Sequence, residues 1–390
     1  MISFDNALQL VLKDVRQAGT ERVSLNESLN RVLAEDIHSD IDMPPFNKAA
    51  VDGYACRKED VHKELEVLEL IAAGDVPTKK ISEGKCTKIM TGAMVPEAAD
   101  VILMVEHTEE TGENKIKFIK EKTNPNIAIK AEDVKVGDLI WSKGMLIKAQ
   151  HIATFAAVGC NNPLVAKKPR VAIMSTGDEL VEPNEKPGKG KIRNSNAYQL
   201  IAQVNEMNCT PNYMGIIPDD EKATDEAISK ALSENDMVIL TGGVSMGDFD
   251  FVPKIMKKNN VDILFQKVAI KPGKPTVFGK TANSYIFGLP GNPVSSFINF
   301  EMFAKPLLYK MMGYDYKKQS FRIPLAVDIK RKKADRLEFL PAIIDDEGAK
   351  PVDYHGSAHI HAICHAHGLI SVPKDVFELK KGEPVDVRPF

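Results

Sequence analysis

The chain has 390 residues, of which 43% are hydrophobic and 27% are charged, and its formal net charge is -3. This length exceeds one ordinary hydrophobic core, so two to four domains are expected, and the near-neutral charge gives no electrostatic case for binding nucleic acid or an anionic membrane. No apolar run approaches the roughly 20 residues that span a bilayer, and the start MISFDNALQL carries acid where a signal peptide needs base, so a soluble cytoplasmic protein is expected.

The N-terminal part contains one predicted helix, which is followed by an extended segment. Apolar residues recur at helical spacing over residues 3–15, directly after a capping Ser3, and this pattern predicts an amphipathic helix. Its apolar face is formed by Leu8, Val11, Leu12 and Val15. Residues 23–42 mix short apolar runs with Asn and Asp, so they are expected to be extended and to contain turns.

A small β-rich module is expected next. The text MPPFNKAAVDGYA contains two prolines and an Asp-Gly turn pair, which predicts a domain boundary with a surface acid, Asp52. Residues 66–120 then show two short strands around a Gly/Pro turn that contains Thr91, and TGENKIKFIK alternates apolar residues with lysines like one arm of a hairpin. A predicted helix over residues 149–158 leads back to the main domain, so the module is inserted between two parts of another domain.

Strands and helices alternate from residue 171 onward, which predicts an α/β domain with a mostly parallel sheet. The predicted strands cover residues 171–174 and 213–220, and the predicted helices cover 196–208 and 221–234. Asp178 and Glu179 follow the first strand at its carboxyl end, where ligands of doubly wound sheets gather, and two acids there suit a hydrated cation; Asp219 lies at the end of the second strand. For the neighbouring Asp178, a capping role in a turn explains the residue equally well.

Three loops between residues 236 and 296 offer groups that bind anions. After a buried strand at residues 237–240, Gly242 and Gly243 lead to a predicted helix over 248–258, and the amides and dipole of a helix N-terminus favour a phosphate or oxyanion. The text KVAIKPGKP gathers three lysines in a loop stiffened by prolines. GLPGNPVSS then forms a turn between a strand ending at residue 287 and another helix. Each loop alone is better explained as a tight turn.

The last 70 residues return to strand-like pieces separated by Gly and Pro, enough for a small β-barrel. They include HGSAHIHAICHAHG, with five of the nine histidines. The spacing is not that of a zinc motif, and the five cysteines of the chain form no CxxC pair, so neither a structural metal site nor a disulfide framework is favoured. Adventitious metal binding at the surface is the preferred interpretation, and an oxyanion contact from His361 is a further possibility.

Together, GGVSMGDFD, KVAIKPGKP, GLPGNPVSS and AAVDGYA closely resemble motifs of the molybdopterin molybdenumtransferase (MoeA) family, to which the E domain of gephyrin is related. The resemblance covers almost the whole chain. It implies a multidomain α/β and β protein: a central MogA-like α/β domain with a mostly parallel sheet (166–317), an inserted β-rich module (46–134), and a C-terminal small β-barrel (318–390). Residues 1–45 and 135–165 would form an N-terminal linking domain.

The resemblance implies that molybdenum is transferred from molybdate into adenylylated molybdopterin with release of AMP, in a Mg²⁺-dependent homodimer that can also contact other proteins of cofactor biosynthesis. The implied catalytic residues are Asp52, Asp133, Glu179, Asp219, Asp250, Lys267 and Lys271. The implied substrate-binding residues are Thr91, Gly242, Gly243, Ser245, Lys274, Ser295, Arg336 and His361. Mg²⁺ would lie near Glu179, Asp219 and Asp250.

One segment departs from the family pattern. Related chains read NIRxxGED where this chain reads NIAIKAED, so Ala128 stands in place of an arginine and Ala131 in place of a glycine. Whether Lys130 replaces the arginine stays open, as does the choice between molybdate and tungstate. Two other functions stay open as well: an adenylyltransferase or nucleotide pyrophosphatase built on the same central domain, and a binding or scaffold role without turnover.

Overall fold

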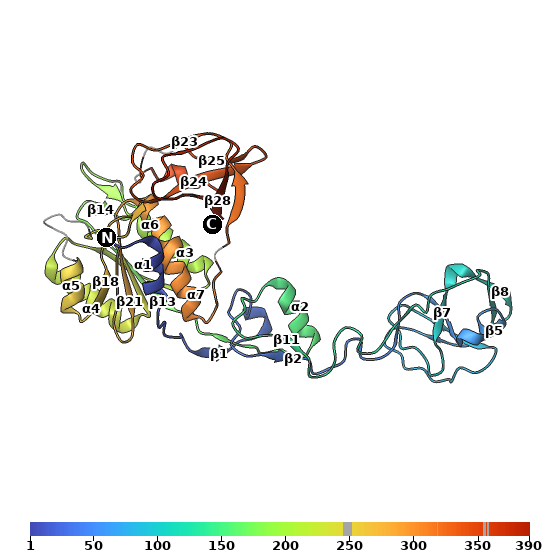
Figure 1. Cartoon of the computed structure of the whole chain (residues 1–390). Coiled ribbons are helices and arrows are strands. Elements are labelled where there is room, and N and C mark those ends of the chain that lie inside the picture. Colours follow the sequence, from blue (N-terminus) through green and yellow to red (C-terminus); the bar gives the residue numbers. More distant parts are fainter. Residues whose placement is uncertain (245–251, 318, 354–355, 357–358) are drawn as a thin grey trace. The chain divides into compact units, whose positions relative to one another are not determined.

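The computed structural model describes residues 1–244, 252–317, 319–353, 356 and 359–390 (Figure 1). The chain forms two compact units. Unit 1 comprises Met1–Glu35, Gly144–Lys148 and Pro163–Phe390, and unit 2 comprises Asp36–Lys143 and Ala149–Asn162. The finer division into four domains stays a prediction. Within the described ranges, none of the helices combines the length and the apolar character that crossing a bilayer requires.

A six-stranded sheet forms the centre of unit 1. Its strand order is β16-β13-β17-β21-β20-β18; the first three pairings are parallel and the last two are antiparallel, so the predicted mostly parallel sheet is confirmed. The strands are β13 (Arg170–Thr176), β16 (Thr210–Ile217), β17 (Met237–Thr241), β18 (Asp262–Phe265), β20 (Val277–Lys280) and β21 (Tyr285–Leu289).

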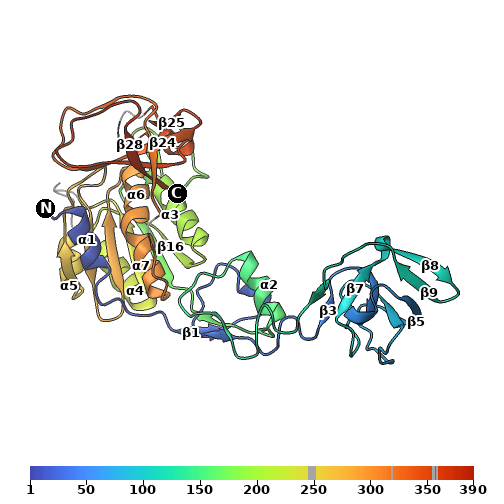
Figure 2. The same ribbon diagram turned by 45° about the vertical axis from the view of Figure 1, so that its right-hand side comes forward.

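Helices cover both faces of this sheet (Figure 2). Successive side chains of a strand point to opposite faces, so Met237 and Ile239 enter one core while Val238 and Leu240 enter the other. The first core includes α1 (Phe4–Val11), α3 (Ser195–Glu206), α6 (Pro293–Asn299), the π-helical turn η4 (Phe300–Ala304) and α7 (Lys305–Met311), and the second includes α4 (Glu221–Glu234) and α5 (Val252–Lys258). The helix predicted over 221–234 is confirmed, whereas residues 248–251 of the next one lie outside the described part.

The first helix is shorter than its sequence pattern predicts. Ser3 caps α1 as expected, with its hydroxyl accepting a hydrogen bond from the backbone N–H of Asn6 at 3.3 Å. The helix ends at Val11 rather than residue 15, and Asp14 adopts a left-handed φ of 51°. Its buried residues are Phe4, Ala7 and Val11, and the ring centroids of Phe4 and Phe303 lie 5.5 Å apart.

The C-terminal part of unit 1 forms the predicted small barrel. β24 (Leu337–Asp345) pairs with β26 (Gly368–Val372), β26 with β28 (Pro384–Pro389), and β28 with β22 (Phe321–Pro324). β25 (Gly348–Pro351) returns to β24, and a bridge between Leu325 and Ala349 closes the ring. β19 (Ile270–Lys271) adds to the edge of β24. Shorter elements of unit 1 are β1 (Thr20–Arg22), η1 (Leu25–Glu27), β12 (Leu164–Ala166), β14 (Leu180–Val181), β15 (Ile192–Arg193), β23 (Ile329–Lys330), β27 (Glu378–Leu379) and α8 (His361–Cys364).

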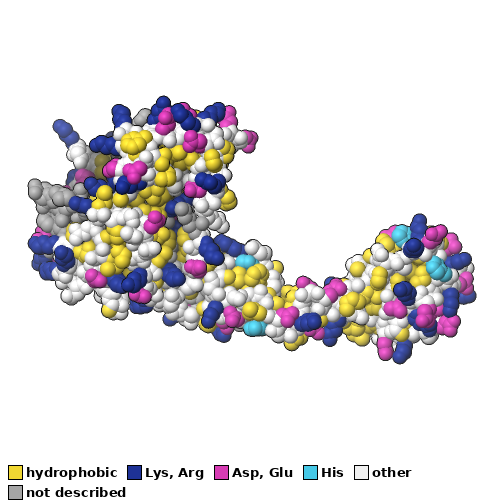
Figure 3. All heavy atoms as spheres, in the orientation of Figure 1, with side chains coloured by type: hydrophobic (Ala, Val, Ile, Leu, Met, Phe, Trp, Pro, Cys, Tyr) yellow, Lys and Arg dark blue, Asp and Glu magenta, His cyan; other side chains and the backbone are white. Residues whose placement is uncertain are grey.

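Unit 2 contains a second six-stranded sheet, of order β7-β4-β6-β5-β9-β8. Its strands are β4 (Gly53–Cys56), β5 (Glu64–Ile71), β6 (Lys85–Ile89), β7 (Val101–Met104), β8 (Thr108–Gly112) and β9 (Lys115–Phe118). The predicted hairpin is β8–β9, with Ile116 and Phe118 buried. The remaining elements are β2 (Ile37–His38), β3 (Lys48–Ala49), η2 (Lys58–Asp60), η3 (Val105–His107), β10 (Ile127–Ala128), β11 (Leu139–Trp141) and α2 (Ala149–Ala157). Acidic and basic side chains are interspersed over the visible surface of the protein (Figure 3).

The departure at Ala131 has a physical consequence. Ala131 has a φ of 61°, a left-handed conformation that costs a residue with a Cβ atom about 1 to 2 kcal/mol. Ala131→Gly should therefore stabilise unit 2 by about 0.5 to 1 kcal/mol after the entropic cost of glycine. Trp141, the single tryptophan, lies in unit 2 and reports its unfolding in urea. Ala128→Gly, in strand β10, is the matched control and should destabilise unit 2; equal destabilisation by both variants would contradict this explanation.

Candidate functional site

A pocket of about 670 Å³ in unit 1 brings together four of the residues that the sequence singled out: Lys271, Lys274, Ser295 and Arg336. The two lysines belong to the proline-containing loop at residues 271–275, called the lysine loop below. Ser295 lies in the first turn of α6, and Arg336 directly precedes β24. The short parallel pairing of β19 with β24 places the lysine loop beside Arg336. The pocket is also lined by Pro272, Gly273, Pro275, Pro290, Asn292, Glu338, Leu340 and Gly356.

The lysine loop is fixed to α6 by a buried polar network. Thr276 Oγ1 lies 2.6 Å from the carbonyl oxygen of Gly273 and 3.0 Å from Asn299 Oδ1. Asn299 Nδ2 donates to the carbonyl oxygen of Ser295 at 2.8 Å. Gly273 adopts a φ of 103°, and a Cβ atom there would lie 2.2 Å from Asn299 Nδ2. Glycine is therefore required for the close approach that sets Lys274 beside Ser295.

Gly273→Ala tests the importance of this approach. The clash and the unfavourable φ should displace the loop and weaken oxyanion binding by about tenfold. Gly382→Ala is the matched control, because Gly382 also has a positive φ, 87°, but no atom within 4 Å of the added Cβ. Titration calorimetry with molybdate measures the effect. An affinity that is the same in both variants would mean that the loop position does not determine binding.

The pocket is lined by three cationic side chains and one carboxylate. Glu338 is 4% exposed, and its Oε1 lies 2.7 Å from Lys271 Nζ while its Oε2 lies 3.4 Å from Arg331 Nη1. Arg336 Nη1 donates to the carbonyl oxygen of Ile270 at 3.2 Å. The excess of positive charge at fixed positions favours an oxyanion. The sequence analysis did not single out Glu338; the available signal was an acid two residues after Arg336.

The loop that begins with Gly242 and Gly243, called the glycine loop below, follows β17 at the carboxyl end of the central sheet. Gly242 has a φ of 94°, and a Cβ atom there would lie 2.6 Å from the carbonyl oxygen of Thr176. Thr176 Oγ1, Asn196 Oδ1 and Ser296 Oγ are buried and lack hydrogen-bond partners within the described ranges. Thr176 ends β13, whereas Asn196 and Ser296 lie near the N-terminal ends of α3 and α6, and buried polar groups without partners suit a polar ligand. Gly243 also has a positive φ, 62°, and Ser245 lies outside the described residues.

Two of the three predicted metal ligands can be placed. Asp219 follows β16, and Glu179 lies between β13 and β14. Asp178 and Asp219 each accept a hydrogen bond from the other's backbone N–H at 3.2 Å, so Asp178 stabilises the turn. In the parts of the chain that are described, no cluster of three metal-binding side chains occurs, and Asp250 lies outside them. The roles of Glu179 and Asp219 as Mg²⁺ ligands stay predictions.

The predicted acids of unit 2 are exposed, and one of them is held in place. Asp52 Oδ1 accepts hydrogen bonds from the hydroxyl and the backbone N–H of Thr91, both at 2.6 Å. These bonds hold the pKa of Asp52 below its ordinary value, so its carboxylate stays ionised. Asp133 follows the turn at Ala131. Lys130 Nζ forms an ion pair with Asp42 Oδ2 at 3.2 Å.

Lys267 and His361, which were also predicted to contact anions, do not line the pocket of Lys274, Ser295 and Arg336, called the oxyanion pocket below. Lys267 precedes β19, and His361 is the exposed first residue of α8. His367 Nδ1 lies 3.1 Å from the backbone nitrogen and oxygen of Ile344, which fixes that ring. Among the described histidines, cysteines and acids, no three gather into a possible metal site, and His355 is outside the described ranges. Surface metal binding by the histidine-rich segment stays a prediction.

Known proteins are similar to this chain along nearly its whole length. Residues 2–159 match the model of the MoeA N-terminal region (domain I and II), 172–310 the probable molybdopterin binding domain, and 322–390 the MoeA C-terminal region (domain IV). The molybdopterin molybdenumtransferase of Staphylococcus epidermidis is 37% identical over 99% of this chain and 95% of its own length. The chain belongs to the molybdopterin molybdenumtransferase family.

Other members of the molybdopterin molybdenumtransferase family show the same extent of similarity. The Bacillus subtilis molybdopterin molybdenumtransferase is 34% identical over 99% of this chain and 93% of its own length. A crystal structure of the moeA molybdopterin biosynthesis protein of Pyrococcus horikoshii covers 100% of both chains, with a TM-score of 0.88 and 34% identity. The family fold therefore extends over both units of this chain.

Proposed function

We propose that this enzyme of molybdenum cofactor biosynthesis inserts molybdenum from molybdate into adenylylated molybdopterin and releases AMP. The observation that carries the proposal is the pocket in which Lys274, Ser295 and Arg336 converge. Molybdate is a small, doubly charged oxyanion, so it needs donors at fixed positions. The anchoring of the lysine loop by Asn299 supplies that rigidity, and the planar guanidinium of Arg336 can offer two parallel donors.

The adenylyl phosphates would lie against the glycine loop, with Lys271 and Lys267 as positive charges. Glu179 and Asp219, with Asp250, would hold Mg²⁺, which would neutralise charge on the phosphate oxygens. Release of Lys271 from Glu338 would let its ammonium group turn to an incoming anion. The test is whether this chain releases AMP from adenylylated molybdopterin in the presence of molybdate and Mg²⁺, and whether a chelator that removes Mg²⁺ stops the release.

We also infer that the working unit is a homodimer in the cytoplasm. The supporting observation is that the candidate residues fall into two separate units: Asp52, Thr91 and Asp133 in unit 2, and the oxyanion pocket in unit 1. A two-fold dimer lets unit 2 of one protomer complete the site of the other. Other proteins of molybdenum cofactor biosynthesis would deliver the adenylylated substrate and accept the product. The oxyanion contact of His361 stays a prediction.

A further inference from the structure

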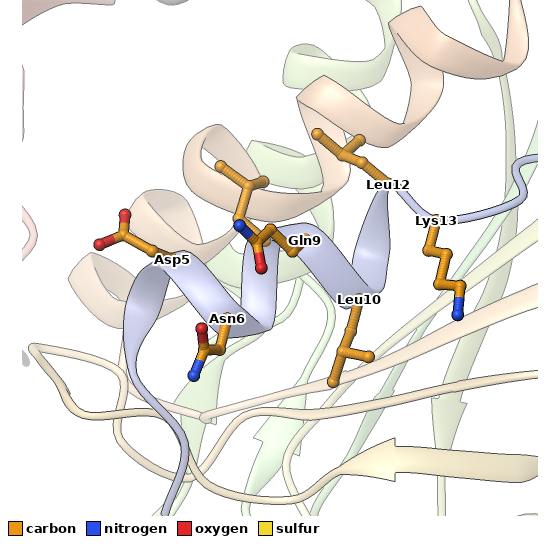
Figure 4. Close-up of a pocket in the computed structure, with 7 residues that line it drawn as sticks. Asp5, Asn6, Gln9, Leu10, Leu12 and Lys13 are labelled. Carbon is orange, nitrogen blue, oxygen red and sulfur yellow. The ribbon is translucent and has the colours of Figure 1, made fainter.

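A small cavity beside α1 contains a buried arginine that forms no ion pair with any described residue. Arg388, in β28, is 8% exposed and lines a cavity of about 70 Å³. Leu8 of α1, the C-cap residue Leu12 and Pro306 of α7 supply much of the apolar wall. Leu12 lies on the side of α1 that faces the neighbouring orange helical segment, whereas Leu10 and Lys13 point the other way (Figure 4). Leu8 and Leu12 also line a second depression along α1.

The charge of Arg388 is poorly compensated. None of the ion pairs between described residues includes it, its Nε has no hydrogen-bond partner, and its Nη1 lies 2.7 Å from Met302 Sδ, a weak acceptor. The rings of Phe4 and Phe339 lie 5.3 and 5.0 Å from the guanidinium carbon and offset part of the cost. Burial lowers the pKa of Arg388 to about 10, against smaller opposing effects of Tyr316, Asp386 and Asp5. A buried cation in this state favours an added anion.

The acidic side chain in the cavity wall, Glu301, already has two partners. Glu301, in the π-helical turn, accepts a hydrogen bond from Gln203 Nε2 at 2.9 Å, and its other oxygen lies 2.6 Å from Lys305 Nζ. Burial disfavours the charged form of Lys305, but Glu301 outweighs this effect and the pKa of Lys305 is raised. Each carboxylate oxygen of Glu301 thus has a partner other than Arg388, and among the described residues no carboxylate pairs with Arg388.

We propose that this cavity binds a small monocarboxylate of the size of formate or acetate. A guanidinium matches the two oxygens of a carboxylate, and the leucine wall accepts a short apolar end. The volume excludes a nucleotide or a pterin. The cavity is separate from the oxyanion pocket, because Glu338 lines that pocket while its neighbour Phe339, on the opposite side of β24, contacts Arg388. The proposal is therefore independent of the proposed function.

Saturation-transfer difference NMR with acetate as the probe tests this proposal on the full chain. The acetate methyl signal should be present in the unaltered protein and fall about tenfold in Arg388→Met, because the charge-assisted bonds are lost. Arg322→Met is the matched control, since Arg322 lies on neighbouring β22 with its side chain 74% exposed, and it should leave the signal unchanged. Lys274→Ala should also leave it unchanged, which separates this cavity from the oxyanion pocket.

A second variant keeps the arginine and fills the space. Leu12→Trp should abolish the acetate signal with Arg388 in place, so the test does not depend on the folding of Arg388→Met. Acetate should also raise the melting temperature of the unaltered protein more than chloride of equal concentration does. The proposal is overturned if Arg388→Met and Leu12→Trp keep the full signal, if Lys274→Ala loses it, or if chloride stabilises the protein as much as acetate.

Discussion

Lys274→Ala is expected to weaken molybdate binding by about 1.5 to 3 kcal/mol, or roughly 10- to 150-fold in the dissociation constant. The reason is the loss of a charge-assisted hydrogen bond from a loop whose position is fixed by Thr276 and Asn299. Binding of adenylylated molybdopterin should change little, because Lys274 is assigned to the oxyanion alone. Titration calorimetry with each ligand separates the two effects.

Arg336→Lys tests whether the geometry of the guanidinium group, and not its charge alone, binds molybdate. The substitution keeps the positive charge but removes the planar pair of donors, so molybdate affinity should still fall by about tenfold or more. Lys257→Ala removes an exposed lysine at the end of α5 and is the control for overall charge. If Arg336→Lys binds molybdate as tightly as the unaltered chain, net charge alone accounts for binding and the geometric role of Arg336 is wrong.

Equal mixing of Asp52→Asn chains with Lys271→Ala chains is expected to restore about a quarter of the unaltered activity, although each variant alone should be nearly inactive. After random exchange about half of the dimers are mixed, and each mixed dimer keeps one of its two sites unaltered if unit 2 of one protomer completes unit 1 of the other. The measurement is the rate of AMP release after subunit exchange has been verified by mass spectrometry.

A matched mixture controls for this effect. Asp52→Asn mixed with Asp133→Asn should show no recovery, because both substitutions lie in unit 2 and every site of a mixed dimer carries one of them. Recovery in both mixtures would point to a cause other than shared sites. If the first mixture shows no recovery although subunit exchange is verified, the sites are not shared and each chain has a complete site of its own.

The central sheet was predicted from signals within single elements. These were the apolar run at residues 237–240, the apolar face of the helix at 221–234, and the order in which strands and helices follow one another. The differences between the predicted and the observed elements come from contacts between residues that are far apart in the sequence. α1 ends at Val11 although apolar residues continue, and the helix after α6 passes through a π-helical turn, which periodicity does not reveal. Tertiary packing of Phe4 against Phe303 selects the buried face of α1.

The site was predictable where one loop carries several functional groups. Lys271, Lys274 and Ser295 lie close in sequence, so their motifs could be read together, whereas Glu338 joins them through the pairing of β19 with β24 across 67 positions. Lys267 belongs to the same lysine-rich text yet does not line the pocket. Sequence spacing alone does not specify side-chain direction in a short irregular segment. Ser245 and Asp250 lie outside the described residues, and their roles stay predictions.

AMP release from adenylylated molybdopterin, with and without molybdate, is the decisive measurement of the proposed activity. With Mg²⁺ present, release by the unaltered chain should depend on molybdate and should be strongly reduced in Lys274→Ala at limiting molybdate. Release of pyrophosphate from ATP and molybdopterin would instead indicate an adenylyltransferase, and tight binding of the adenylylated pterin without AMP release would indicate a binding role. AMP release at the same rate with and without molybdate would contradict the proposed coupling of metal insertion to cleavage.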